Sequence, residues 1–246
     1  MTFIILTLAS IFAWFVSMVA GGGSSLVLIP VVSLCLGATA IPPVITIGGI
    51  FGNSERIFAY RENINWQVIK WELPGAIVGG CLGAFTFTQL KLEWVTVIVS
   101  FFLIISGISF LIKKEKKSFT VRVWYFLPAG FLYAFLSGII GSMGSVLAPL
   151  YLNYGLKKEE LLGTQALNRV VVHIIKIIAY GIFGVLHPDE IGYGIIIGLA
   201  SIPGNFLGHL VLQKMSDQLF RKLVISFILV SGIIMLWQER YFFSFW

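Results

Sequence analysis

Long stretches of the chain carry almost no charged side chains, and their boundaries predict the helices. The first 54 residues, Met1 to Ser54, contain no Asp, Glu, Lys, Arg or His. As one helix rising about 1.5 Å per residue they would extend about 80 Å, whereas the hydrocarbon core of a bilayer is about 30 Å thick. This stretch alone therefore predicts more than one membrane crossing. We read Met1 to Val19 as a retained first helix, because further apolar chain follows it directly.

Ten uncharged or nearly uncharged runs predict ten helical segments and an all-α integral membrane protein. They are residues 2–19, 24–36, 43–60, 72–90, 94–112, 123–140, 145–155, 161–185, 191–212 and 219–237. Eight are long, but 24–36 and 145–155 hold 13 and 11 residues, fewer than the about 20 that a full helical span needs. Each short run follows a break rich in glycine and serine, at residues 21–25 and 141–145.

The second half of the chain resembles the first half at a shift of 118 to 125 residues. The matches occur in the same order in both halves. Residues 19–23 match 138–142, Pro30 matches Pro149, and Tyr60 matches Tyr180. Gly79 and Gly83 then match Gly204 and Gly208, and residues 106–108 match 231–233. Such self-similarity predicts two transmembrane repeats, residues 1–112 and 123–246, joined by a basic linker at 113–122.

Basic residues indicate how the repeats are oriented, because cytoplasmic loops are enriched in Lys and Arg. With five crossings in each half and the linker in the cytoplasm, twelve basic residues lie inside and only Lys91 and Arg240 lie outside. The twelve are Arg61, Lys70, Lys113, Lys114, Lys116, Lys117, Arg122, Lys157, Lys158, Lys214, Arg221 and Lys222. With four crossings per half, the short runs being re-entrant, this bias disappears.

An odd number of crossings inverts the second repeat relative to the first and places both termini outside. Inverted repeats are common among secondary transporters, which bind substrate near the membrane midplane at interrupted helices. The pattern therefore predicts a multi-pass protein of the cytoplasmic membrane that works by alternating access of two inverted five-segment repeats.

Composition excludes several other classes of protein. Charged residues make up 11% of the chain and hydrophobic residues 58%, unlike soluble domains, in which about a quarter of residues are charged. The net charge of +6 comes from short clusters between apolar runs, which argues against nucleic acid as a partner. Cys35 and Cys81 lie in apolar runs without metal-ligand spacing, and the chain has no recognisable catalytic motif. We therefore expect no metal, no cofactor and no enzymatic activity.

The two breaks predict an anion site. Interrupting a helix in the bilayer leaves backbone groups that protein, water or a ligand must satisfy, and N–H groups at the start of a helix suit an anion. A helix starting at Ser24 or Ser25 and another starting at Ser145 would form a symmetric cradle. The candidate residues at the breaks are Gly22, Gly23, Ser24, Ser25, Ser142, Gly144 and Ser145. The alternative is that these small residues only allow close helix packing.

A polar stripe in the run 161–185 predicts further site residues. Arg169, His173 and Lys176 fall within about 60° of one another on a helix, and charged side chains inside a span rarely face lipid. The repeat aligns Asn53 with His173 and Arg56 with Lys176. Thr46, Thr164 and Asn168 lie near the same faces as weaker candidates. The alternative is a structural network that ties helices together.

The stripe and the breaks favour a small anion as the transported partner. The sequence does not choose between a proton and a sodium ion as the coupling ion, nor between a monomer and a homo-oligomer. Membrane lipid is expected to surround the protein. Two rivals are an intramembrane enzyme or lipid-handling protein that uses His173 for acid–base work, and a noncatalytic membrane assembly factor.

The same residues resemble the TauE/SafE family of sulfite and organosulfur anion exporters over nearly the whole chain. The resemblance rests on the early Ala-Gly-Gly-Gly-Ser with Pro30, the Thr46 helix, the Asn65-Trp66 turn, the glycine helix from Pro74 to Gly83 and the recurrence from Gly138. The second break departs from the triple glycine of the first. The resemblance implies transport of sulfite, a sulfonate such as sulfoacetate or a related anion, driven by an ion gradient.

Overall fold

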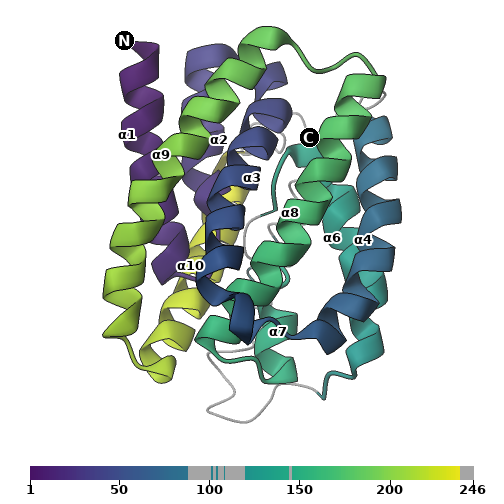
Figure 1. Ribbon diagram of the computed structural model, residues 1–246, viewed down its shortest axis with the longest axis vertical. Helices are drawn as coiled ribbons and strands as arrows, with labels where there is room; N and C mark the ends of the chain where they lie inside the picture. Colours follow the sequence, from purple (N-terminus) through teal and green to yellow (C-terminus); the bar gives the residue numbers. More distant parts are fainter. Residues whose placement is uncertain (88–100, 102–103, 105–107, 109–119, 144–145, 239–246) are drawn as a thin grey trace.

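The computed structural model describes residues 1–87, 101, 104, 108, 120–143 and 146–238, and in this part of the chain the regular structure is helical (Figure 1). The nine helices bounded there are α1 (Thr2–Val19), α2 (Ser24–Leu36), α3 (Ile41–Tyr60), α4 (Trp66–Phe87), α6 (Phe126–Ile140), α7 (Ala148–Tyr154), α8 (Lys158–Ile182), α9 (Pro188–Gln213) and α10 (Asp217–Gln238).

Nine of the ten predicted segments coincide with these helices. The predicted segment 94–112 lies almost entirely outside the described residues. The largest shift concerns α4, which begins at Trp66 rather than at residue 72. Trp66 and Trp71 therefore belong to the helix, and the charged Lys70 and Glu72 do not delay its start.

Among the described residues, five segments are long and apolar enough to cross a membrane: Thr2–Val19, Trp66–Phe87, Val123–Ile140, Lys158–Ile182 and Pro188–Gln213. The short helices are different, because α2 has 13 residues and α7 has seven, equivalent to rises of about 20 Å and about 10 Å. Neither of them reaches across the hydrocarbon core by itself.

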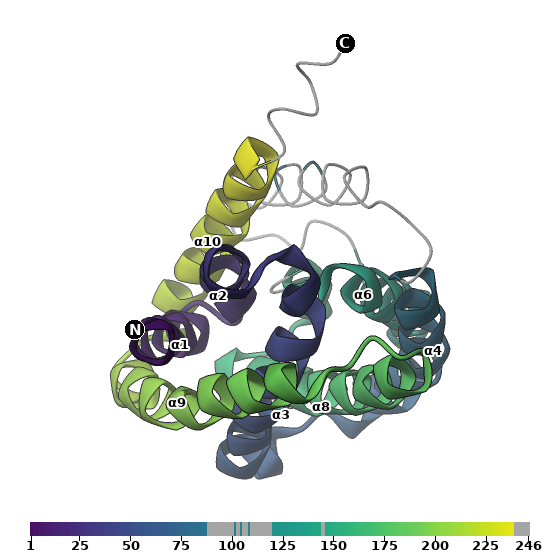
Figure 2. The ribbon, with the colours of Figure 1, turned by 90° about the horizontal axis from the view of Figure 1, so that it is seen from above.

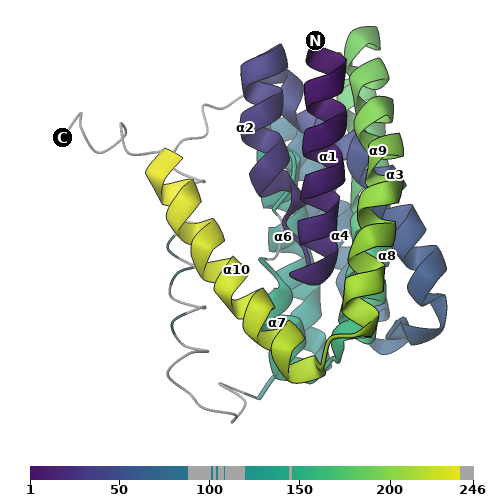
Figure 3. The ribbon, with the colours of Figure 1, turned by 90° about the vertical axis from the view of Figure 1, so that its left-hand side faces the viewer.

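Glycine allows the chain to turn at both breaks. Gly21, Gly22 and Gly23 between α1 and α2 have φ of 72°, 134° and 96°, and Gly141 after α6 has φ of 100°, a region that L residues with a Cβ rarely adopt. After the first break α2 runs back along α1, as Figure 3 shows. After the second break the helix begins at Ala148, three residues later than the predicted start at Ser145.

Helices from the two halves of the chain are interleaved. α4 packs along α6, α1 packs along α9, and α3 contacts both α8 and α9 (Figure 2). The α4–α6 contact is close because Gly75, Gly79 and Gly83 face the backbone of α6. Gly204 and Gly208 of α9 face α1 in the same manner. The spaced glycines are thus packing positions, as small residues between membrane helices usually are.

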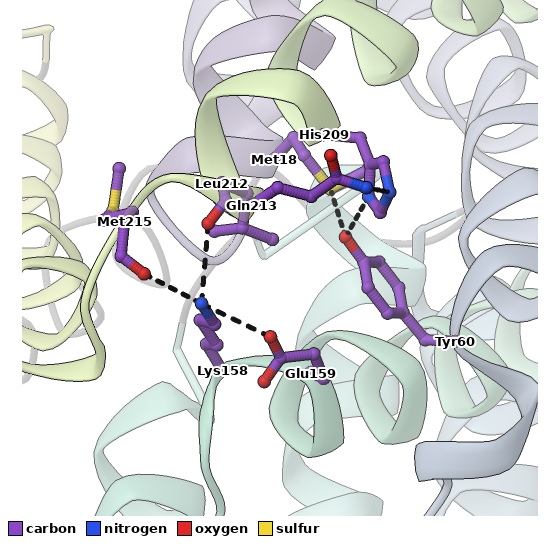
Figure 4. A network of polar contacts seen from close by, with 8 residues as sticks. All are labelled: Met18, Tyr60, Lys158, Glu159, His209, Leu212, Gln213 and Met215. Atoms are coloured by element: carbon purple, nitrogen blue, oxygen red, sulfur yellow. Dashed lines mark hydrogen bonds and ion pairs between the residues drawn. The ribbon is translucent and has the colours of Figure 1, made fainter.

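Basic residues gather at one end of the bundle, where the α3–α4 turn, the start of α8 and the α9–α10 turn lie (Figure 1). Lys158 Nζ donates to the carbonyl oxygens of Leu212 at 3.4 Å and Met215 at 2.7 Å and pairs with Glu159 at 3.3 Å (Figure 4). Beside them, Tyr60 Oη hydrogen-bonds to His209 Nδ1 at 2.6 Å. These contacts close this end by joining α3, α8 and α9.

The close contact of α4 with α6 generates a test. A Cβ at Gly79 would lie 2.2 Å from the carbonyl oxygen of Phe131, whereas a Cβ at Gly80 would meet nothing nearer than 3.4 Å. Gly79→Ala should destabilise the protein by about 1–3 kcal/mol or more, because the helices must separate, and Gly80→Ala should leave stability nearly unchanged. The midpoint of thermal unfolding in detergent measures both. Equal midpoints for the two variants would contradict the packing described here.

Candidate functional site

A small cavity lies where the two breaks approach each other. Its walls come from α1, α2, α3, α8 and the chain after α6. The lining residues are Trp14, Gly23, Ser24, Leu28, Ile45, Gly49, Asn53, Ser142, Arg169 and His173. The free volume is about 10 Å³, close to the least that holds one water molecule. Residues more than 100 positions apart in the sequence thus share one space with a mixed polar and apolar lining.

Glycines let the walls of this cavity come together. A Cβ at Gly49 would lie 2.6 Å from His173 Nε2, and a Cβ at Gly52 would lie 2.6 Å from the ring of Trp14. At the first break, a Cβ at Gly23 would lie 2.0 Å from the Phe227 ring of α10. α3 therefore touches α1 and α8 directly, and α10 covers the first break from the side.

In the part of the chain that the structure describes, three buried polar atoms on the lining residues have no hydrogen-bond partner: Trp14 Nε1, Asn53 Oδ1 and His173 Nδ1. Trp14 and His173 are each 2% exposed. An unpaired buried polar group costs about 1–3 kcal/mol, so three on one cavity are a substantial cost. The indole nitrogen can only donate, which suits a ligand that carries acceptor oxygens.

Positive charge is concentrated around the cavity. Arg169 lines it while donating from Nη2 to Gln165 Oε1 at 2.7 Å, and the charge of Arg56 interacts with that of Arg169. The N-terminus of α2 adds Ser24 and the positive end of a 13-residue helix. Together these groups favour an anion in the cavity.

Arg56 lies behind the wall rather than in the cavity. Its Nε donates to Asn205 Oδ1 at 3.1 Å, its Nη2 donates to the Trp14 carbonyl at 3.5 Å, and its guanidinium covers the Trp14 ring at 5.0 Å. Arg56 therefore joins α3 to α1 and α9, which matches the network alternative for this residue.

Lys176 also binds protein groups. Its Nζ donates to Ser137 Oγ at 3.2 Å and to the Gly141 carbonyl. Thr46 Oγ1 donates to the same carbonyl at 3.5 Å, and Tyr180 Oη donates to the Gly138 carbonyl at 2.6 Å. These side chains satisfy carbonyls that the end of α6 leaves without helical partners, so Lys176 and Thr46 hold the second break.

The other predicted site residues are divided between wall and surroundings. Gly23, Ser24, Asn53, Ser142, Arg169 and His173 line the cavity, whereas Gly22 and Ser25 are buried beside the first break without lining it. Thr164 Oγ1 accepts from the Asn65 backbone N–H at 2.9 Å, so it fixes the α3–α4 turn. Gly144 and Ser145 lie outside the described residues.

Sequence reasoning missed the buried carboxyl of Glu72. Its oxygens accept from Tyr151 Oη at 2.6 and 2.7 Å, and Oε1 also accepts from Asn168 Nδ2 at 2.7 Å. The residue was assigned to the margin of a span, but α4 begins six residues earlier and carries Glu72 into the bundle, where it is 0% exposed. Lys70 lies two residues before Glu72, so the local sequence does not separate this acid from the charges that flank a span.

A metal centre has no support in the described residues, where no group of three or more His, Cys, Asp or Glu side chains could hold an ion. Trp14, Leu28, Ile45 and Gly49 are lining residues that the sequence pattern did not indicate. They are apolar or aromatic residues in apolar runs, so nothing in their local sequence separates them from ordinary core positions.

Comparison with known proteins identifies the family. The family model described as "Sulfite exporter TauE/SafE" matches residues 6–235. No curated protein and no solved structure matches the chain. Among the described residues, the matched region includes the first break, the cavity, seven complete helices and most of α1 and α10. The chain is therefore a multi-pass membrane protein that belongs to the sulfite exporter TauE/SafE family.

Proposed function

We propose that this protein is a secondary transporter of small anions, namely sulfite, a sulfonate or a related organosulfur anion, and that the cavity between the breaks is its substrate site. The observation that carries the proposal is the set of unpaired buried polar atoms on a cavity that Arg169 also lines. Family membership supports the transported class, since the family exports sulfite or related anions.

The lining chemistry suits a sulfur oxyanion. Its oxygens are acceptors, and the cavity offers donors from the Trp14 indole, the Arg169 guanidinium and the hydroxyls of Ser24 and Ser142. Asn53 Oδ1 would pair with a water molecule or with a hydroxyl of the protonated anion. His173 Nδ1 serves as donor or acceptor according to its tautomer.

The size of the cavity supports a closed state of an alternating-access cycle. About 10 Å³ holds a water molecule but not a four-atom anion, so binding and release require the walls to move apart. The Lys158 and Tyr60–His209 contacts join α3, α8 and α9 at the basic end, and we propose that they open when the site faces that side.

Equivalent contacts support two inverted repeats, residues 1–112 and 123–246 with the linker 113–122. The repeat aligns α1 with α6 and α4 with α9. α4 of the first half packs on α6 of the second half, and α9 of the second half packs on α1 of the first half. Arg56 and Tyr60 bind Trp14 and Met18 of α1, and the aligned Lys176 and Tyr180 bind Gly141 and Gly138 at the end of α6. We propose that the end carrying the basic turns is cytoplasmic and that both termini lie outside.

Two rival functions find less support. An acid–base role for His173 needs a partner that orients the ring, and His173 Nδ1 has none among the residues that the structure describes. A noncatalytic assembly factor would not need a cavity with unpaired donors and a guanidinium.

Sulfite flux in proteoliposomes tests the substrate site. Arg169→Ala should lower the flux at subsaturating sulfite by at least about 30-fold, because losing one partner of a desolvated charge pair costs about 2–5 kcal/mol. Arg61→Ala, which removes an exposed cation from the α3–α4 turn, is the matched control and should keep full flux. No saturable sulfite flux in the wild type under any imposed gradient would overturn the proposed function.

Trp14→Phe removes the unpaired indole donor and keeps an aromatic ring beneath Arg56. Sulfite affinity should fall by about 10-fold to 100-fold, since a hydrogen bond to a charged group contributes about 1.5–3 kcal/mol. Trp66→Phe, at the exposed start of α4, should bind sulfite normally. Calorimetric titration in detergent measures both, and unchanged affinity in Trp14→Phe would remove this residue from the site.

Labelling of single cysteines tests the orientation. In a background with Cys35 and Cys81 replaced by serine, Asp189→Cys at the start of α9 should react with a membrane-impermeant maleimide on intact cells. Lys214→Cys in the α9–α10 turn should react only after permeabilisation, because the positive-inside rule places it in the cytoplasm. The reverse pattern would invert the proposed topology.

A further inference from the structure

A second polar site lies beside the proposed anion cavity, centred on the carboxyl group of Glu72. Glu72 comes from α4, Tyr151 from α7 and Asn168 from α8, and their contacts of 2.6 to 2.7 Å bring three helices together. Glu72 and Tyr151 are at most 1% exposed. An ionisable side chain buried inside a transporter is expensive, and such residues usually belong to an ion or proton pathway.

Arg169 connects this site to the anion cavity. It lines the cavity with His173, and it also lines the space bounded by Tyr133, Tyr151, Gln165 and Asn168. Its charge acts on Glu72 and on Tyr133. One guanidinium therefore lies within electrostatic reach of two negative groups, the Glu72 carboxylate and an anion in the cavity.

The hydrogen bonds around Glu72 suit both of its protonation states. As a carboxylate, it accepts from Tyr151 and Asn168. As a carboxylic acid, it can donate to Tyr151 Oη, whose own proton then needs an acceptor. Within the described part of the chain, Asn168 Oδ1 has no hydrogen-bond partner, and Asn168 and Tyr133 line the same space as Tyr151. An unpaired acceptor of this kind lets the network rearrange without breaking the fold.

The groups facing Glu72 favour a proton over a metal cation. They are Tyr133 of α6, Tyr151 of α7 and Arg169 of α8. The positive charge of Arg169 repels a sodium ion at this position, whereas a proton neutralises the carboxylate and needs no set of oxygen ligands.

We propose that Glu72 is the coupling site of this transporter and binds one proton that is carried together with the anion. This inference rests on the proposed anion site. The proton comes from the solution on the side where the anion enters and leaves on the other side, and no covalent bond to the anion is formed or broken. Protonating Glu72 frees the charge of Arg169 for the anion, and a bound anion in turn favours the proton, because coupling between two sites is reciprocal.

Titration calorimetry of the purified protein with sulfite, in buffers of different ionisation enthalpy, counts the protons taken up per anion bound. Glu72→Gln keeps the size and hydrogen-bonding capacity of the side chain but cannot take up a proton. At the pH where wild-type uptake is largest, this variant should bind sulfite and take up fewer protons, by up to about one per anion. Protons exchanged by sulfite itself are common to both proteins and cancel in the difference.

A second pair of variants keeps the test valid if Glu72→Gln does not fold. Tyr151→Phe removes a donor that stabilises the carboxylate, so the pH dependence of proton uptake should move to higher pH. Tyr154 lies on the same helix as Tyr151, and its hydroxyl is 3.4 Å from Gln67 Oε1. Tyr154→Phe is therefore the control variant and should behave as wild type.

The outcomes separate the two proposals. Sulfite binding with equal proton uptake in wild type and Glu72→Gln would overturn Glu72 as the coupling site and leave the anion site standing. Sodium-dependent sulfite binding that is lost in Glu72→Gln would overturn the proton in favour of sodium. Absence of sulfite binding in the wild type would instead refute the proposed anion site, and the coupling proposal with it.

Discussion

The fold depends on one constraint, the need to satisfy backbone groups wherever a helix is interrupted in an apolar medium. The chain interrupts two helices, after Val19 and after Ile140. At the second interruption, Lys176, Thr46 and Tyr180 supply donors to the carbonyls of Gly141 and Gly138. Buried polar side chains of α3 and α8 are thus required before any substrate is considered.

This requirement explains why the stripe on α8 serves two purposes. Lys176 is committed to the break, whereas His173 and Arg169, one and two turns earlier, reach the cavity. The structural network and the proposed binding site, which the sequence presents as alternatives, are adjacent parts of one helix face. Where protein side chains satisfy the carbonyl groups before a break, the residues after the break can still contact a ligand.

Glycine spacing connects the packing of the bundle to the site. Gly75, Gly79 and Gly83 bring the backbones of α4 and α6 together, and the Glu72 carboxyl of the same helix accepts from Tyr151 of α7 and Asn168 of α8. Gly49 performs the corresponding task between α3 and α8 by making room for His173. The positions of the polar groups therefore follow from contacts that only glycine permits.

The sequence by itself determined the membrane class, the ends of most helices, both breaks and six of the cavity residues, because the lack of charge, helical periodicity and glycine clusters are local signals. It did not separate Arg169 from Arg56 and Lys176, since all three are cations on buried helix faces. Only the tertiary structure decided which of them face the cavity, because their partners, Asn205, Trp14 and Gly141, come from other helices. For the same reason Glu72 could be recognised only once α6, α7 and α8 had enclosed it.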